Sequence, residues 1–167
     1  GLEAQPVDQT RVAASSADKT SPQSAELTRG AFYQVVLALL EGKLPPSVFN
    51  RRFKPQANFL QLTCPAPSTH YELWMHRDCT EVALHFEGRR ERNLALLDQF
   101  RPHLEALQGQ LNEPIYAEPW GKNWARVYLK RSPIRLDKPT ASVVAEDWLR
   151  FIEATLPVVK KAVADLG

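Results

Sequence analysis

The sequence predicts an α+β fold: a two-layer sandwich in which helices cover one face of an antiparallel sheet, in the order α-β-β-β-α-β-β-α. Residues 69–87 alternate apolar and polar side chains, as strands with one polar face do. The segments before and after them carry apolar residues at helical spacing instead. Strands with polar outer positions disfavour a doubly wound parallel sheet, because such a sheet is buried on both faces.

Residues 69–87 are the expected central hairpin, with a tight turn at Asp78-Cys79. If Arg77 faces Thr80, one side of the hairpin is wholly apolar, with the pairs Tyr71–Phe86, Leu73–Leu84 and Met75–Val82. The same register sets four pairs opposite one another on the other side: His70–Glu87, Glu72–His85, Trp74–Ala83 and His76–Glu81. The separation of apolar and paired polar residues favours this register.

Length and composition bound the classes of protein. A chain of 167 residues, 44% of them hydrophobic, is large enough for one domain with a proper core. The 21 basic and 19 acidic residues nearly balance, so the composition indicates no general affinity for nucleic acid. There is no apolar run near the ~20 residues that a membrane span needs and no signal peptide. We therefore expect a cytoplasmic protein without a membrane partner.

The two cysteines, Cys64 and Cys79, lack the spacing of a zinc site. We expect reduced thiols, with a disulfide or a reactive thiol as the alternative.

Residues 1–20 have the composition of a linker or tail, and residues 21–167 that of a single α+β domain. The leading Gly1 suggests a tag remnant or a fragment of a longer protein. Ser21 as N-cap, Pro22 at the first helical position and Gly42 after the last predict the first helix. A short strand over residues 57–64 precedes the central hairpin, which makes a three-stranded meander.

After Gly88, a leucine-rich helix runs to Leu107, and Pro102 should kink or divide it. Residues 114–118 and 124–130 predict a second hairpin. A connector containing Pro133 and Pro139 leads to a last helix, which Thr140 or Ser142 opens and in which Pro157 predicts a kink.

The order of elements is similar to that of the type III secretion chaperone-like fold, in topology only. A closer resemblance covers about residues 25 to 165. It rests on Phe32-Tyr33, the strand ending at residues 82–88, the leucine-rich helix, Glu113-Pro114 and the spacing of Lys122 and Arg126. These features resemble a bacterial family of unknown function, typically found C-terminal to a PD-(D/E)XK nuclease-like region. The resemblance implies a non-catalytic accessory domain in a DNA-processing or defence setting.

Basic and aromatic residues are expected to share the open face of the sheet. Aromatic rings with cations are typical of single-strand nucleic-acid platforms, but aromatic residues and arginine are also enriched at protein interfaces. The loop at residues 119–124 contains two tryptophans, whose rings either cover the sheet edge or belong to a recognition loop with Trp120 as its anchor and Lys122 and Arg126 as anion contacts. The candidate binding residues are Trp74, Trp120, Lys122, Arg126, Tyr128 and Lys130, with Arg131 as a further member.

Histidines and glutamates alternate on the polar side of the central hairpin. We interpret them as a charge-balanced ladder on an exposed sheet face; metal binding or acid–base chemistry is the alternative, with His70, Glu72, His76, Glu81 and His85 as its residues.

We expect no cofactor, and binding rather than catalysis. The partner would be a protein, a missing N-terminal domain or a second copy of the chain. A nucleic-acid-binding module is the first alternative, and a metal-dependent enzyme that uses the His/Glu face is the second.

Overall fold

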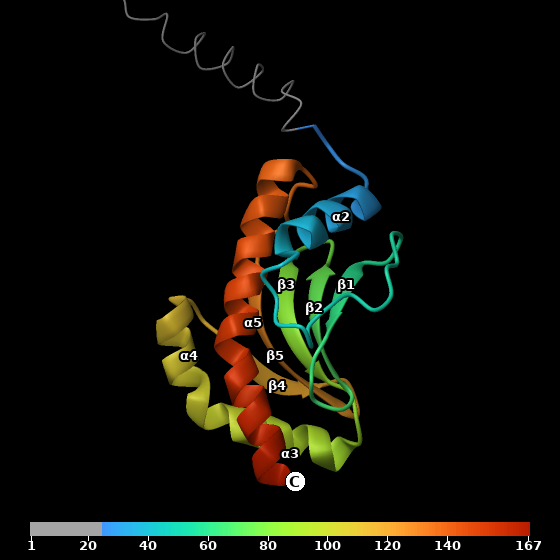
Figure 1. Ribbon diagram of the computed structural model, residues 1–167. Helices are drawn as coiled ribbons and strands as arrows, with labels where there is room; N and C mark the ends of the chain where they lie inside the picture. The colour runs from blue at the N-terminus through green and yellow to red at the C-terminus, as the bar shows by residue number, and fades with distance from the viewer. Residues whose placement is uncertain (1–24) are drawn as a thin grey trace, which may run out of the picture.

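The computed structural model describes residues 25–167 (Figure 1). Along the chain these residues form α2 (Arg29–Leu40), β1 (Phe59–Thr63), β2 (Thr69–Met75), β3 (Thr80–Phe86), α3 (Arg90–Phe100), the 3-10 turn η2 (Arg101–His103), α4 (Leu104–Leu111), β4 (Tyr116–Trp120), β5 (Trp124–Arg131) and α5 (Lys138–Leu166). The predicted tail over residues 1–20 lies outside this range.

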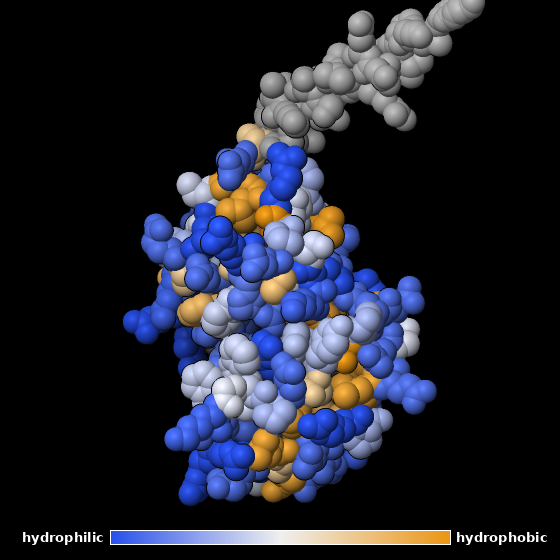
Figure 2. All heavy atoms as spheres, turned by 180° about the vertical axis from the view of Figure 1, so that it is seen from behind, coloured by the Kyte–Doolittle hydropathy of each residue, from blue (hydrophilic) through white to orange (hydrophobic). Residues whose placement is uncertain are grey.

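The strands form one antiparallel sheet in the order β1-β2-β3-β5-β4. The meander of β1, β2 and β3 is as predicted, and the second hairpin joins it through β5. In Figure 1, α5 runs across the front of the sheet, α2 lies near its upper end and α3 near its lower end. The predicted α+β fold is confirmed. We call the side of the sheet away from α5 the open face; seen from that side, the surface is mostly hydrophilic (Figure 2).

Alternating side chains of the strands and one stripe of α5 make the core. Trp148, Phe151 and Ile152 of α5 are fully buried. The Tyr71 ring of β2 meets the Phe151 ring edge-on, with centroids 6.1 Å apart, and its hydroxyl is 2.8 Å from Thr155 Oγ1. Burying one large apolar side chain is worth about 1.5–3 kcal/mol, so this stripe fixes α5 on the sheet. Among the helices of residues 25–167, none is both long and apolar enough for a membrane span.

The predicted register of the central hairpin is wrong by two residues. Tyr71 lies opposite Leu84, Leu73 opposite Val82, and His70 opposite His85. The connection is a loop over residues 76–79, closed by a hydrogen bond of 2.8 Å from His76 N to Cys79 O. A two-residue hairpin turn needs positive φ, and none of residues 76–79 has it. Because side chains alternate with period 2, the slip leaves every residue on its predicted face.

The first helix begins later than predicted. Ser21 and Pro22 lie outside the described residues, residues 25–28 are not helical, and Thr28 is the N-cap, whose hydroxyl accepts from Ala31 N at 3.2 Å. At the other end Gly42 has φ of +77°, the left-handed conformation expected of a glycine after a helix.

Prolines act differently in the two later helices. Around Pro102 the leucine-rich segment divides into α3, η2 and α4, as predicted. Helix α5 instead continues through Pro157. It also starts earlier than expected: Asp137, not Thr140 or Ser142, is its N-cap, and Pro139 belongs to its first turn.

We predict that Asp137→Ala lowers the free energy of unfolding by about 1 kcal/mol, because its carboxylate accepts from Thr140 N at 2.9 Å and caps the longest helix. Asp137→Asn keeps the acceptor and should lose less. Urea unfolding followed by tryptophan fluorescence measures both; equal losses in the two variants would contradict the capping role.

The same cap should make stability depend on pH. Hydrogen bonding to Thr140, with help from the charge of Arg135, outweighs burial and lowers the pKa of Asp137 below its usual 3.8. A lowered folded-state pKa stabilises the protein above pH 3.8, and the contribution is lost as pH falls through the folded value. The difference in stability between wild type and Asp137→Asn should therefore shrink as the pH is lowered below 3.8; a constant difference would contradict this.

Candidate functional site

The open face carries most of the predicted binding residues. Register places Trp74 on β2, Arg126, Tyr128 and Lys130 on β5, and Trp120 at the end of β4, opposite Trp124. Lys122 lies in the β4–β5 turn, where its carbonyl accepts from Arg90 Nε at 3.4 Å. Arg131 does not belong to this face, because the alternation of β5 turns it toward the helices.

Arg131 instead joins three elements on the helix side. Its guanidinium pairs with Glu113, which follows α4, at 2.7 Å between Nη2 and Oε2, and with Asp147 of α5 at 3.1 Å. The hydrogen bond with Glu113, opposed by burial and aided by Asp147, raises the pKa of Arg131. Glu113 of the Glu-Pro pair thus meets Arg131, not Lys122 or Arg126.

A band of rings in tilted contact crosses all five strands of the open face. Phe59 of β1 stacks with Trp74 of β2 at 5.7 Å between centroids, and Trp74 lies 6.5 Å from His85 of β3. His85 lies 6.3 Å from Trp120 of β4, and the series continues through β5. We call this set the aromatic band; its members are Phe59, Trp74, His85, Trp120, Arg126, Tyr128 and Tyr116.

Arg126 is the centre of the band's β5 half. Its guanidinium carbon lies 4.0 Å from the Trp120 centroid and 3.9 Å from that of Tyr128, as in cation–π stacking. Tyr128 in turn lies 5.4 Å from Tyr116, which is 46% exposed. The band therefore ends at a large aromatic side chain that reaches solvent.

Carboxylates neutralise Arg126. Nη1 is 2.6 Å from Glu81 Oε1, and Nη2 is 2.8 Å from Glu118 Oε1. The Tyr128 hydroxyl also donates to Glu118 at 3.0 Å. Burial works to raise the pKa of Glu118, but the hydrogen bonds from Arg126 and Tyr128 lower it. Burial and the bond to Glu118 raise the pKa of Tyr128. Each of the three nitrogens of Arg126 thus donates one hydrogen bond to a glutamate of the same face.

Two histidines and a glutamate gather beside the band. Because of the observed register, His70 faces His85, and both contact Glu72 of β2. His70 Nε2 is 3.4 Å from Glu72 Oε1, and His85 Nδ1 is 3.3 Å from Glu72 Oε2. Glu72 and His85 are each 2% exposed. Burial favours a higher pKa for Glu72, yet its contacts with His70, His85 and Gln61 lower that pKa. The three predicted His/Glu pairs, His70–Glu87, Glu72–His85 and His76–Glu81, are all in contact, but not as directly opposite residues. The first two pairs instead meet in one cluster in which Glu72 and His85 are buried and His70 is partly buried.

A second group, His76, Cys79 and Glu81, lies at the hairpin loop, where the imidazole of His76 contacts the carboxylate of Glu81. Both cysteines are free thiols. Burial raises the pKa of Cys64 to about 11, which keeps that thiol protonated and unreactive at neutral pH.

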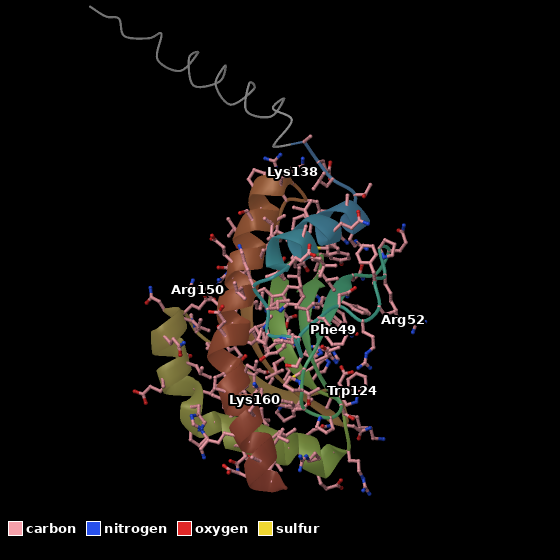
Figure 3. The ribbon with its side chains drawn as sticks, in the orientation of Figure 1. Phe49, Arg52, Trp124, Lys138, Arg150 and Lys160 are labelled. Carbon is pink, nitrogen blue, oxygen red and sulfur yellow. The ribbon has the colours of Figure 1, made fainter. Side chains whose placement is uncertain are left out.

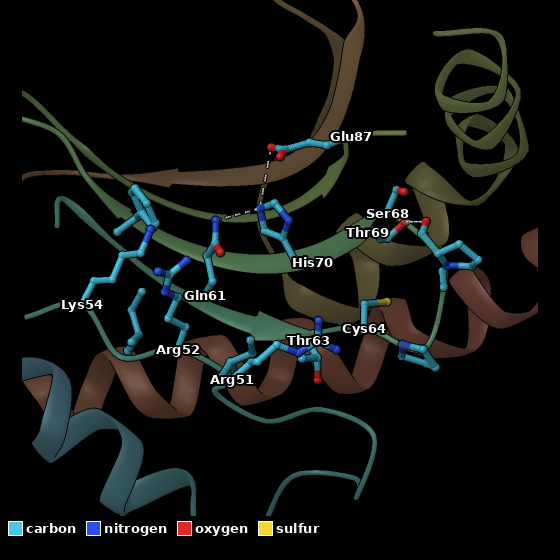
Figure 4. Close-up of a pocket in the computed structure, with 16 residues that line it drawn as sticks. Arg51, Arg52, Lys54, Gln61, Thr63, Cys64, Ser68, Thr69, His70 and Glu87 are labelled. Atoms are coloured by element: carbon cyan, nitrogen blue, oxygen red, sulfur yellow. Dashed lines mark hydrogen bonds and ion pairs between the residues drawn. The ribbon is translucent and has the colours of Figure 1, made fainter. Parts of the chain in front are cut away.

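Basic residues before β1 border a pocket that the sequence did not indicate. Arg51, Arg52 and Lys54 line it together with His70 and Glu87 (Figure 4). Its volume is about 710 Å³. Gln61 of β1 also lines it, and its amide contacts His70 Nε2 at 3.3 Å and Glu72 Oε1 at 2.9 Å. Only the pairing of β1 with β2 brings Gln61 to the histidines.

No protein-family model matches the chain, and no curated protein matches it significantly. The relationship to the nuclease-associated family remains a prediction from the residues quoted above.

We predict that Arg126→Met lowers the free energy of unfolding by about 3 kcal/mol, because it leaves the carboxylate of Glu81, a residue only 5% exposed, without the guanidinium that it pairs with at 2.6 Å. Combining it with Glu81→Gln should restore part of the loss. Urea unfolding provides the values. Lys130→Met, at an exposed site on the same strand, is the control and should change stability by less than about 0.5 kcal/mol. A similar small effect for Arg126→Met would contradict the buried ion pair.

Proposed function

We propose that this is a non-catalytic interaction domain that binds a protein surface through the aromatic band on its open face. The observation that carries the proposal is the continuity of the band, in which successive ring or guanidinium centres lie 3.9 to 6.5 Å apart from β1 to β4. Preassembled aromatic and arginine side chains are what energetic centres of protein interfaces are made of. The ring contacts and the ion pairs of Arg126 hold these side chains before a partner arrives, so binding would lose little conformational entropy.

The charge of the face favours a partner with basic and apolar side chains. Four carboxylates, those of Glu72, Glu81, Glu87 and Glu118, lie on or beside its central strands, where the cations are Arg126, Lys130 and the turn residue Lys122. At the β1 edge Lys54 adds a cation, with its ammonium 5.8 Å from the Phe59 centroid. A single-strand nucleic-acid platform needs unpaired cations near its rings to contact phosphates, whereas Arg126 is bound to glutamates. Protein binding is therefore the better-supported function. In the setting that the family resemblance implies, the partner would be a neighbouring domain or another subunit of a DNA-processing or defence protein.

We predict that peptides selected from a random phage-displayed library on the 167-residue protein combine basic and large apolar residues. Their affinity, measured by calorimetry, should fall about tenfold or more with Tyr116→Ala or Trp74→Ala, because loss of an aromatic residue that anchors an interface typically costs more than 1 kcal/mol. Phe49→Ala is the matched control: Phe49 is a similarly exposed aromatic residue, 48% against 46% for Tyr116, and lines a groove with α2 residues (Figure 3).

Two results would overturn this function. One is a set of selected peptides that bind both band variants as tightly as wild type. The other is salt-dependent binding of a fluorescent single-stranded oligonucleotide that Trp74→Ala abolishes, because that outcome would assign the band to nucleic acid.

A further inference from the structure

The cluster of His70, Glu72 and His85 contains two buried polar atoms without a hydrogen-bond partner. They are Glu72 Oε2 and His85 Nδ1, and they face each other at 3.3 Å. Leaving such a group unpaired in the interior costs about 1–3 kcal/mol. Both atoms are good metal ligands, and each points at the other across the space between β2 and β3.

The distances within the cluster fit a shared ion. A tetrahedral zinc ion with bonds of about 2.0–2.1 Å separates its ligand atoms by about 3.3–3.4 Å. Glu72 Oε1 lies 3.4 Å from His70 Nε2 and Glu72 Oε2 lies 3.3 Å from His85 Nδ1, so each oxygen of the carboxylate has this spacing from one imidazole. Glu87 Oε2 approaches the same two nitrogens at 3.7 and 3.4 Å. The three residues His70, Glu72 and His85 each offer a ligand atom within 4.8 Å of the other two.

We propose that His70 Nε2, a Glu72 carboxylate oxygen and His85 Nδ1 bind one divalent transition-metal ion of the zinc type, with Glu87 beside the remaining coordination position. Two imidazoles and a carboxylate suit Zn²⁺ far better than Mg²⁺ or Ca²⁺, which prefer oxygen ligands alone. The ion would bind both Glu72 Oε2 and His85 Nδ1, which contact each other at 3.3 Å without a hydrogen bond.

The surroundings provide a second shell and a neighbouring pocket. Gln61 Nε2 donates to Glu72 Oε1 at 2.9 Å and also lies 3.3 Å from His70 Nε2. With an ion bound to His70 Nε2, the amide would still hold the Glu72 carboxylate in place. His70 and Glu87 also line the pocket next to β1, so this side of the cluster borders the pocket (Figure 4).

The ion would fasten β2 to β3 on the open face. Its effect is separate from the proposed protein binding, since it would be measured on the protein alone. Any ligand that binds only the folded state raises the unfolding temperature, and a buried ion between two strands does so directly.

We predict that chelator-treated protein binds one Zn²⁺ per chain by calorimetry and that its melting temperature rises on addition. Co²⁺ in its place should give the visible absorption of a low-coordinate site. His70→Asn, at a side chain 17% exposed and therefore tolerant of change, should weaken Zn²⁺ binding by more than about tenfold. Glu72→Gln should do the same, and far-ultraviolet circular dichroism checks that each variant is folded.

His103→Asn and Cys79→Ser are the matched controls and should bind Zn²⁺ like wild type: the first removes a histidine of η2, the second a member of the other cluster. Zn²⁺ binding that survives His70→Asn but disappears with Cys79→Ser would overturn the proposal and move the ion to the hairpin loop. Equal melting temperatures with chelator and with Zn²⁺, without a Co²⁺ spectrum, would overturn it altogether.

Discussion

Strand β3 is buried on both faces although helices cover only one, and the rest of the structure follows from this constraint. On the helix side its apolar residues meet the core. On the open side Glu81 and His85 are 5% and 2% exposed and need polar partners from the neighbouring strands. Arg126 supplies one for Glu81, and Glu72 lies against His85. The open face is thus a packed polar layer under aromatic rings, not a solvated surface.

The two faces of the sheet could be predicted from the sequence, because period-2 alternation survives any slip by an even number of residues. The register could not. Asp78-Cys79 suggested a two-residue turn, but neither residue takes the positive φ that such a turn needs. The predicted register also favoured a charge-balanced ladder over the metal-binding alternative, because it places each histidine opposite a glutamate, whereas the observed register sets His70 directly opposite His85.

The side-chain pairs between residues far apart in the sequence could not be predicted either. Arg131 and Arg126 are close in sequence and alike in chemistry, yet one meets Asp147 of α5 and the other Glu81 of β3. Arg126 and Arg131 are five residues apart on β5, so the alternation of a strand places them on opposite faces. The same alternation excludes Arg131 from the binding residues of the open face. Nothing local in the sequence names Glu118, Glu113 or Gln61 as partners, because strand order and helix docking bring them there. Asp137 could have been found: it lies two residues before a proline, at a helix start.

The band and the histidine cluster share His85, whose ring lies between Trp74 and Trp120 and whose Nδ1 faces Glu72. Whatever holds this imidazole in one orientation also fixes the two tryptophans beside it. The rigidity of the aromatic surface therefore depends on the polar groups beneath it.

The strand order also indicates that the two halves of the open face form at different stages of folding. Strands β1, β2 and β3 pair with near neighbours in sequence, whereas the β3–β5 seam joins residues 80–86 to residues 125–131 across α3, η2 and α4. Closing that long loop costs entropy before its contacts form, so non-local pairing is the slow step of such topologies. His70, Glu72 and His85 all belong to the meander and can assemble early in folding. The aromatic band exists only after the seam has closed.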